Sequence, residues 1–139
     1  MNQGKVLQGM LVLWAIWEII NGLLSTFAPA AGASLVGWQV TWTPDLVAMS
    51  TQYGMILLLL GGVYLLAASD VKRYQPLVWV IVAEQVLALV YSAYLTFGTG
   101  TMTNSQFLTQ AVINIIVAAL FWILAGGIGG MQRGRTSAA

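Results

Sequence analysis

The 139-residue sequence contains no cysteine and no histidine. This composition excludes a disulfide, a thiolate nucleophile, a Ser-His-Asp triad, a histidine-ligated haem and an ordinary zinc site. Only two carboxylates, Glu18 and Glu84, are expected at membrane depth, which is too few for a carboxylate-bridged di-iron centre with its about four carboxylates and two histidines. We therefore expect no metal and no cofactor, and most classes of metal and redox enzyme are excluded.

Charged residues are scarce as well, at 6% of the chain against 59% apolar residues. A typical soluble domain has about 25% charged and about 45 to 50% apolar residues. A water-soluble fold could not bury this much apolar surface, so lipid should surround most of the chain. The net charge is only +1 and the basic residues are scattered, which leaves no electrostatic footprint for nucleic acid.

Four apolar runs are long enough to cross a bilayer, which takes roughly 20 helical residues. They predict an all-α fold, an integral membrane four-helix bundle that forms a single transmembrane domain over residues 1–139. The predicted spans cover residues of about 6–28, 45–69, 76–97 and 105–127, with an outer loop over residues 29–44.

Turn and cap residues between these runs agree with the predicted spans. Thr43, Pro44 and Asp45 form a typical helix start, and Pro76 can open the third span in the same way. Small and polar residues mark the remaining ends: Gly98 and Gly100 for the end of the third span, Thr103, Asn104 and Ser105 for the start of the fourth, and Gly126-Gly127 for its stop.

All five basic residues fall on one side of the predicted membrane: Lys5, Lys72, Arg73, Arg133 and Arg135. The positive-inside rule makes this side cytoplasmic, with both chain termini. Lys5 and the apolar run after it also imitate a secretory signal peptide, but Glu18 and Asn21 interrupt the run and favour a membrane span. We therefore predict a multi-pass protein of the cytoplasmic, or inner, membrane.

Residues 29–42 form the one sizeable external connection. They carry Trp38 and Trp42 but no charge, so we expect an aromatic anchor in the outer interface, where indole rings prefer to lie. The alternative is a lid over a cavity that opens outward. A short surface helix is expected near residues 31–37.

Polar side chains occur at membrane depth in all four spans. An ionisable residue there costs on the order of 3 kcal/mol by insertion scales, so it usually faces the protein interior and has a partner. Glu18 and Glu84 lie on spans that run in the same direction, at similar expected depths, and could share one cavity. With neighbours at helical spacing, the predicted patch comprises Glu18, Asn21, Gln52, Tyr53, Glu84, Gln85, Tyr91, Gln110 and Asn114.

Three interpretations of this patch remain open. The first is interhelical hydrogen bonding, at about 0.6 to 2 kcal/mol per contact. The second is a pocket for a lipid-soluble molecule, in which a buried glutamic acid acts as an acid or a donor. The third is proton-coupled transport, which needs helix breaks for which only Gly61-Gly62 are candidates. We expect close helix packing at the small residues instead: Gly54, Gly61 and Gly62 on the second span, and Ala111, Ala118 and Ala125 on the fourth.

Short hydropathy and turn patterns are spread along most of the chain. They lie at residues 21–24, 27–30, 35–37, 67–70 and 76–79, and at Glu84-Gln85 and Tyr91. In these patterns the chain resembles the small four-helix bacterial membrane proteins of the DoxX-like and BphX-like type. The resemblance implies an association with membrane-bound oxidoreductase or aromatic-degradation systems. The DoxX type is regarded as a membrane subunit of a quinone-reducing enzyme, although the cysteine-dependent features of some relatives have no counterpart here.

Two functions follow as hypotheses. The leading one is a non-enzymatic accessory or scaffold subunit, because no complete catalytic set is present; its partners are the lipid bilayer and other membrane subunits. The rival is a binding protein or cofactor-free isomerase for a hydrophobic small molecule such as a quinone, a sterol-like molecule or a terpenoid. The rival predicts that Glu18 and Glu84 pair beside Tyr91 and Asn114 in a cavity in the outer half of the bundle.

Overall fold

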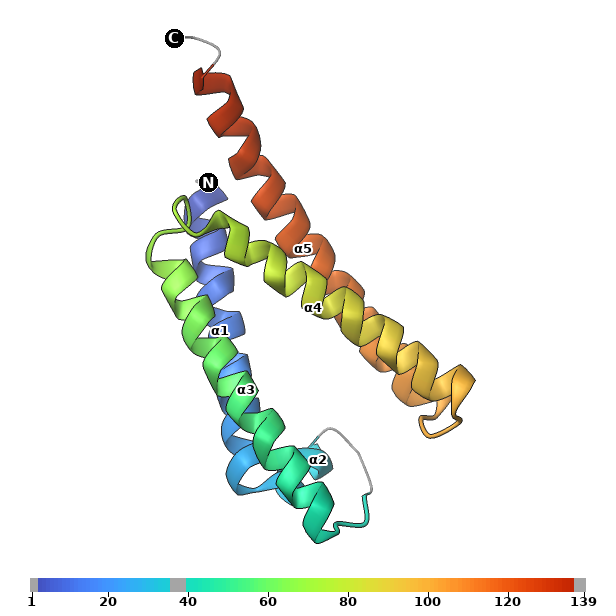
Figure 1. Ribbon diagram of the computed structural model, residues 1–139. Coiled ribbons are helices and arrows are strands. Elements are labelled where there is room, and N and C mark those ends of the chain that lie inside the picture. Colours follow the sequence, from blue (N-terminus) through green and yellow to red (C-terminus); the bar gives the residue numbers. More distant parts are fainter. Residues whose placement is uncertain (1–2, 36–39, 137–139) are drawn as a thin grey trace. The chain divides into compact units, whose positions relative to one another are not determined.

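Every element in the computed structural model, which describes residues 3–35 and 40–136, is a helix (Figure 1). Side chains are described as far as Gly126. In chain order the elements are α1 (Gln3–Phe27), α2 (Pro29–Leu35), α3 (Pro44–Ser69), α4 (Gln75–Ala93), the π-helical turn η1 (Tyr94–Gly98) and α5 (Asn104–Thr136). The chain is all-α, as the sequence predicts.

Four helical segments are long and apolar enough to cross a membrane. They are Gln3–Phe27, Pro44–Ser69, Gln75–Gly98 and Asn104–Gly126, with lengths of 23 to 26 residues. At 1.5 Å of rise per residue each is about 34 to 39 Å long, which exceeds the hydrocarbon core of about 30 Å. Large apolar side chains such as Leu59 and Leu87 are exposed along them. This surface suits lipid, and the protein is a multi-pass membrane protein.

The helices belong to two compact units. The first, here called the α1–α3 unit, is Gln8–Asp70, and the second, the α4–α5 unit, comprises Met1–Leu7 and Val71–Ala139. Each unit is built around one antiparallel pair of long helices. The single transmembrane domain over residues 1–139 stays a prediction.

In the α1–α3 unit, α1 and α3 approach each other closely at glycines. A Cβ atom added to Gly54 would lie 2.6 Å from the carbonyl oxygen of Gly22, and one added to Gly61 would lie 2.6 Å from Cγ1 of Ile19. Both separations are too short for real atoms, so the predicted close packing at Gly54 and Gly61 is confirmed. It is wrong for Gly62, where an added Cβ would meet nothing within 4 Å. Successive residues point about 100° apart around a helix, so two neighbours cannot both face α1.

Side-chain caps begin two of the long helices, as predicted. The backbone N–H of Leu46 donates to Thr43 Oγ1 at 3.3 Å, with Pro44 in the first turn of α3. At the start of α5, the N–H of Gln106 donates to Thr103 Oγ1 at 3.3 Å and the N–H of Thr103 donates to Gln106 Oε1 at 3.0 Å. This reciprocal pair is a capping box, which satisfies two donors that a bare helix start leaves without partners.

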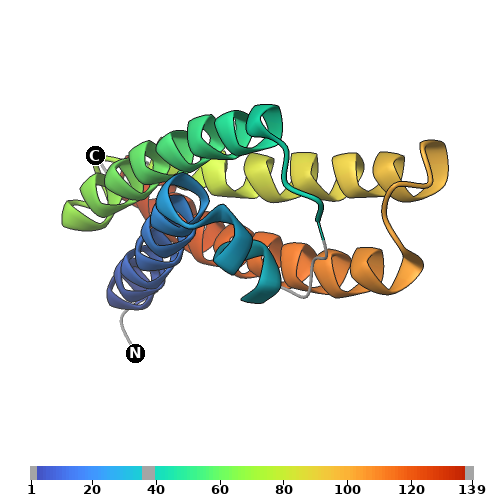
Figure 2. The ribbon, with the colours of Figure 1, turned by 90° about the horizontal axis from the view of Figure 1, so that it is seen from below.

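In the α4–α5 unit, α4 and α5 lie side by side in opposite directions (Figure 2). Two edge-to-face aromatic pairs contribute to this unit. Trp79 of α4 packs on Trp122 of α5 at 5.0 Å between ring centroids, and Phe97 of η1 packs on Phe107 of α5 at 5.2 Å. Fifteen residues separate Phe107 from Trp122, so the pairs lie about 22 Å apart along α5. Tryptophan rings such as Trp79 and Trp122 are typical of a membrane interface.

The connection between α4 and α5 is tight. The N–H of Thr99 donates to the carbonyl oxygen of Tyr94 at 3.1 Å, five residues earlier, which closes the π-turn. Gly100 then adopts a positive φ of 67°, a conformation that glycine tolerates without strain. The prediction that Gly98 and Gly100 end the third span is confirmed.

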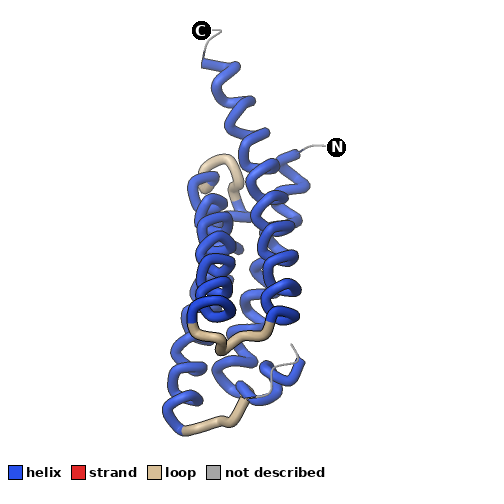
Figure 3. Tube along the Cα trace, turned by 90° about the vertical axis from the view of Figure 1, so that its right-hand side faces the viewer, coloured by secondary structure: helices blue, strands red, loops and turns tan. Residues whose placement is uncertain are grey.

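The predicted stop of the last helix at Gly126-Gly127 is wrong. The helix α5 continues through both glycines to Thr136 (Figure 3). Glycine lowers helix stability by about 1 kcal/mol relative to alanine but does not block the backbone hydrogen bonds, and no proline follows to do so. The apolar run ends near Ala125, whereas the helix does not.

The connection between α1 and α3 contains the short helix α2, which agrees with the expected surface helix but begins earlier. It follows α1 almost directly, because the N–H of Ala28 donates to Leu24 O at 2.8 Å and that of Gly32 donates to Ala28 O at 3.0 Å. Trp42 is half-buried. The proposed anchor Trp38 lies outside the described residues.

Candidate functional site

The nine residues of the predicted polar patch divide between the two units. Those on α1 and α3 belong to the α1–α3 unit: Glu18, Asn21, Gln52 and Tyr53. Those on α4 and α5 belong to the α4–α5 unit: Glu84, Gln85, Tyr91, Gln110 and Asn114. The pairing of Glu18 with Glu84 therefore stays a prediction.

On α1 the two polar residues lie one turn apart. Glu18 is buried, with 4% of its surface exposed, in line with the buried Leu11, Ala15 and Gly22 along the helix. A buried acid in an apolar helix needs polar partners, because lipid and apolar side chains offer none. Asn21 is half-buried, and its Nδ2 donates to the carbonyl oxygen of Trp17 at 2.8 Å. The amide of Asn21 is thus used within its own helix.

On α3, Gln52 and Tyr53 are exposed, and Tyr53 has 58% of its surface accessible. The polar contacts between α1 and α3 come from their neighbours instead. Ser50 Oγ donates to the carbonyl oxygen of Ser25 at 3.0 Å, and Thr51 Oγ1 donates to that of Val47 at 2.9 Å and lies 3.5 Å from that of Thr26. These two hydroxyls were not predicted, although both helices carry a Ser-Thr dipeptide, at residues 25–26 and 50–51.

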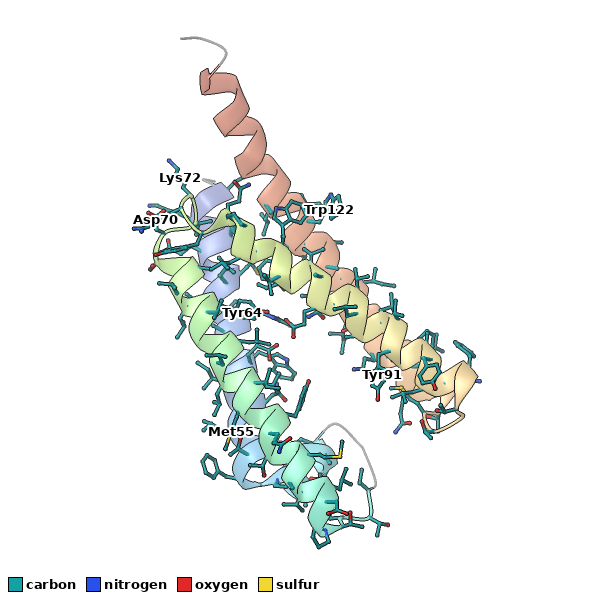
Figure 4. The ribbon with its side chains drawn as sticks, viewed as in Figure 1. Met55, Tyr64, Asp70, Lys72, Tyr91 and Trp122 are labelled. Atoms are coloured by element: carbon teal, nitrogen blue, oxygen red, sulfur yellow. The ribbon has the colours of Figure 1, made fainter. Side chains whose placement is uncertain are left out.

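On α4, Gln85 is more deeply buried than Glu84 or Tyr91, with 4% of its surface exposed. Glu84 is half-buried and Tyr91 is 62% exposed, near the end of α4 that leads into η1 (Figure 4). The buried Ser92 donates from Oγ to the carbonyl oxygen of Ala88 at 2.6 Å. Such a bond returns the hydroxyl to its own helix.

On α5, Asn114 is 6% exposed and Gln110, one turn earlier, is half-buried. Asn114 shares a face of α5 with the buried Ala111 and Phe121. Its Nδ2 makes no hydrogen bond to any described residue. A buried donor without an acceptor costs about 1 to 3 kcal/mol, so this amide is the patch group with the strongest need for a partner.

Two further buried or bonded polar residues were not predicted. Tyr64 is fully buried on α3, three residues beyond Gly61, at the spacing of the buried face (Figure 4). Gln75, in the first turn of α4, donates from Nε2 to the carbonyl oxygen of Ala125 on α5 at 2.8 Å. A bond from Gln75 to another helix was not predicted, because Gln75 lies beside Pro76 at a helix start and residues there usually bond within their own helix.

The chemistry available to these groups is limited. Among the residues described, no three acidic side chains are grouped so that they could hold a metal ion. The buried groups are carboxyl, amide and hydroxyl, which donate and accept hydrogen bonds. They can join helices, or bind polar atoms of a small molecule.

Comparison with known proteins finds no match to a protein-family model, to a curated protein or to a solved structure. The resemblance to the DoxX-like and BphX-like type therefore stays a prediction from the residue patterns.

Proposed function

We propose that this protein is a non-enzymatic accessory or scaffold subunit of a membrane complex. The proposal rests on the acceptors to which four polar side chains donate their hydrogen bonds. Asn21, Ser50, Gln75 and Ser92, on three helices, all donate to backbone carbonyl oxygens. Two of these bonds, from Ser50 and Gln75, join the paired helices. The two interhelical bonds support helix packing, and the bonds of Asn21 and Ser92 return these groups to their own helices.

The proposal also covers the membrane, the orientation of the chain in it and the family. The location is the inner membrane of a bacterium, with both termini in the cytoplasm, because all five basic residues lie in the segments on one side of the four spans. The family is the DoxX-like or BphX-like type, on the residue patterns of the chain. A reporter fused after Ala139 tests the orientation, since activity of a periplasm-dependent reporter there would contradict it.

The decisive experiment removes each acid while keeping its hydrogen-bonding ability. In the variants Glu18→Gln and Glu84→Gln, folding and assembly should remain close to those of the wild type, because the amide replaces the carboxyl in hydrogen bonding. Detergent extraction followed by native mass spectrometry measures both. Loss of a cellular activity in a variant that stays folded and assembled would contradict an accessory role.

A second candidate function is binding of a hydrophobic small molecule, such as a quinone, a sterol-like molecule or a terpenoid. The buried Nδ2 of Asn114 favours it, because this donor has no acceptor among the described residues. A carbonyl or hydroxyl oxygen of a ligand would satisfy the donor. Native mass spectrometry of the extracted protein separates the two functions: a co-purifying subunit supports the first, and a retained small molecule supports the second.

A further inference from the structure

The last helix contains a glycine run where it leaves its partner. Four of the five residues from Gly126 to Gly130 are glycine, with Ile128 between them, and α5 passes through all five. Each glycine weakens a helix by about 1 kcal/mol relative to alanine. The run is therefore the least stable part of α5.

Close packing does not explain the first of these glycines. At Gly22, Gly54 and Gly61 an added Cβ would overlap a neighbouring helix, whereas at Gly126 it would meet nothing within 4 Å. Gly62 also has open space, but it belongs to a single pair with Gly61, and close packing against α1 explains Gly61. At Gly126 the useful property of glycine is its backbone freedom.

The glycine run begins at the level of the first turn of α4, and α5 continues past the start of α4 (Figure 1). Gln75 Nε2 donates to the carbonyl oxygen of Ala125 at 2.8 Å, and Trp79 packs on Trp122 one turn further along the pair. A side-chain donor on this carbonyl can replace the backbone N–H of residue 129 if the following turn opens. Gln75 thus holds the end of the paired part of α5 whether or not the helix continues.

The residues near Ala125 in the α4–α5 unit are of the types found at a membrane boundary. Trp79 and Trp122 are both exposed, as is usual for indoles in an interfacial belt. Lys72 and Arg73, which lie in the turn before α4, are exposed as well, and Figure 4 shows Lys72 in this turn. Indoles followed by cations are the usual order of residues from the hydrocarbon core toward water.

Beyond this boundary the chain is basic. The segment after Gly126 carries Arg133 and Arg135 and no acidic residue. In a straight helix these two residues would lie about 12 and 15 Å beyond Ala125, past a headgroup layer of about 5 to 8 Å. A bend at the glycines would bring them back to the level of the lipid phosphates.

We propose that the run from Gly126 to Gly130 is a hinge at the membrane boundary, and that the basic segment after it turns there to bind anionic lipid headgroups beside Lys72 and Arg73. The partner is an anionic lipid surface because the segment has two cations, no acid and only a few apolar residues. This inference does not depend on the accessory role.

The test uses the full-length protein in lipid nanodiscs. Because the chain has no cysteine, Thr136→Cys accepts a single environment-sensitive fluorophore. Quenching by a headgroup-attached quencher gives the ratio of docked to free segments, in phosphatidylcholine alone and in a mixture rich in phosphatidylglycerol. Three variants are compared with the labelled protein: Arg133→Gln with Arg135→Gln, alanine at all four glycines of the run, and the control Gly62→Ala. Circular dichroism verifies that each variant is folded.

An arginine near an anionic surface favours binding about fivefold, so the two together should raise the docked-to-free ratio about 25-fold in the anionic mixture. The glutamine variant should lose this rise, the four-alanine variant should remain undocked in both lipids, and Gly62→Ala should behave as the wild type. Equal quenching in the two lipids would overturn the proposal. So would docking of the four-alanine variant to the wild-type extent, since no hinge would then be needed.

Discussion

Gly22 of α1 and Gly54 of α3 lie against each other so closely that neither position has room for a methyl group. A Cβ on Gly22 would be 2.9 Å from the carbonyl oxygen of Gly54, and a Cβ on Gly54 would be 2.6 Å from that of Gly22. In a membrane, packing of this kind takes over the role that burial of apolar surface has in water, because lipid is as apolar as the side chains. The contact therefore holds the α1–α3 unit together.

Gly54→Ala should destabilise the protein by about 1 to 3 kcal/mol, the usual effect of overpacking. The matched control is Gly62→Ala on the same helix, where the added methyl group meets open space and better helix propensity should give a small gain. Detergent-induced unfolding followed by tryptophan fluorescence measures both. Equal losses in the two variants would show that close approach of the helices is not the reason.

The hydroxyl of Ser50 should contribute less than the glycine contact. Ser50→Ala removes the bond to Ser25 O and should lower the free energy of unfolding by about 0.6 kcal/mol, and at most about 1.7 kcal/mol. Ser69→Ala is the control, because Ser69 Oγ donates within its own helix to Leu66 O. The same unfolding assay applies, and a larger loss at Ser69 would contradict an interhelical role for Ser50.

The helices and most of their ends could be predicted because they depend on local properties. Apolar length determines a span, and the caps at Thr43 and Thr103 act over three residues. The end of α5 was missed for the opposite reason. A glycine pair permits a stop but does not require one, and the helix continues to Thr136.

Contacts between helices were harder to predict, because they depend on which face each residue occupies. Gly61 and Gly62 are adjacent residues of the same type, yet only Gly61 contacts α1. Gly22 was missed although Ala15 lies seven residues before it, a spacing that matches Gly54 and Gly61 on α3. For the polar patch, spacing identified Glu18, Gln85 and Asn114, which are buried, but it could not separate them from residues at the exposed edge such as Tyr91.

The capping box at the start of α5 can be tested with an isosteric change. Thr103→Val removes the acceptor for the N–H of Gln106 and should destabilise the first turn by about 1 kcal/mol. Hydrogen exchange at the Gln106 amide should then be roughly fivefold faster, by the same free energy. In the control Thr109→Val, the lost hydroxyl donates to Ser105 O inside the helix, and exchange at Gln106 should not change. Unchanged exchange in Thr103→Val would show that the box does not hold the helix start.

Asn114→Leu distinguishes the two candidate functions. If the amide has only the protein around it, its Nδ2 is a buried donor without an acceptor, and an apolar side chain of similar size should raise the free energy of unfolding by about 1 to 2 kcal/mol. Asn21→Leu is the control, because it removes a bond to Trp17 O that is present, and it should give no such gain. Detergent-induced unfolding of both variants, with native mass spectrometry of the extracted protein, reports stability and bound molecules together. A loss of stability in Asn114→Leu accompanied by release of a small molecule would mean that the acceptor comes from a ligand, and the accessory role would give way to a binding function.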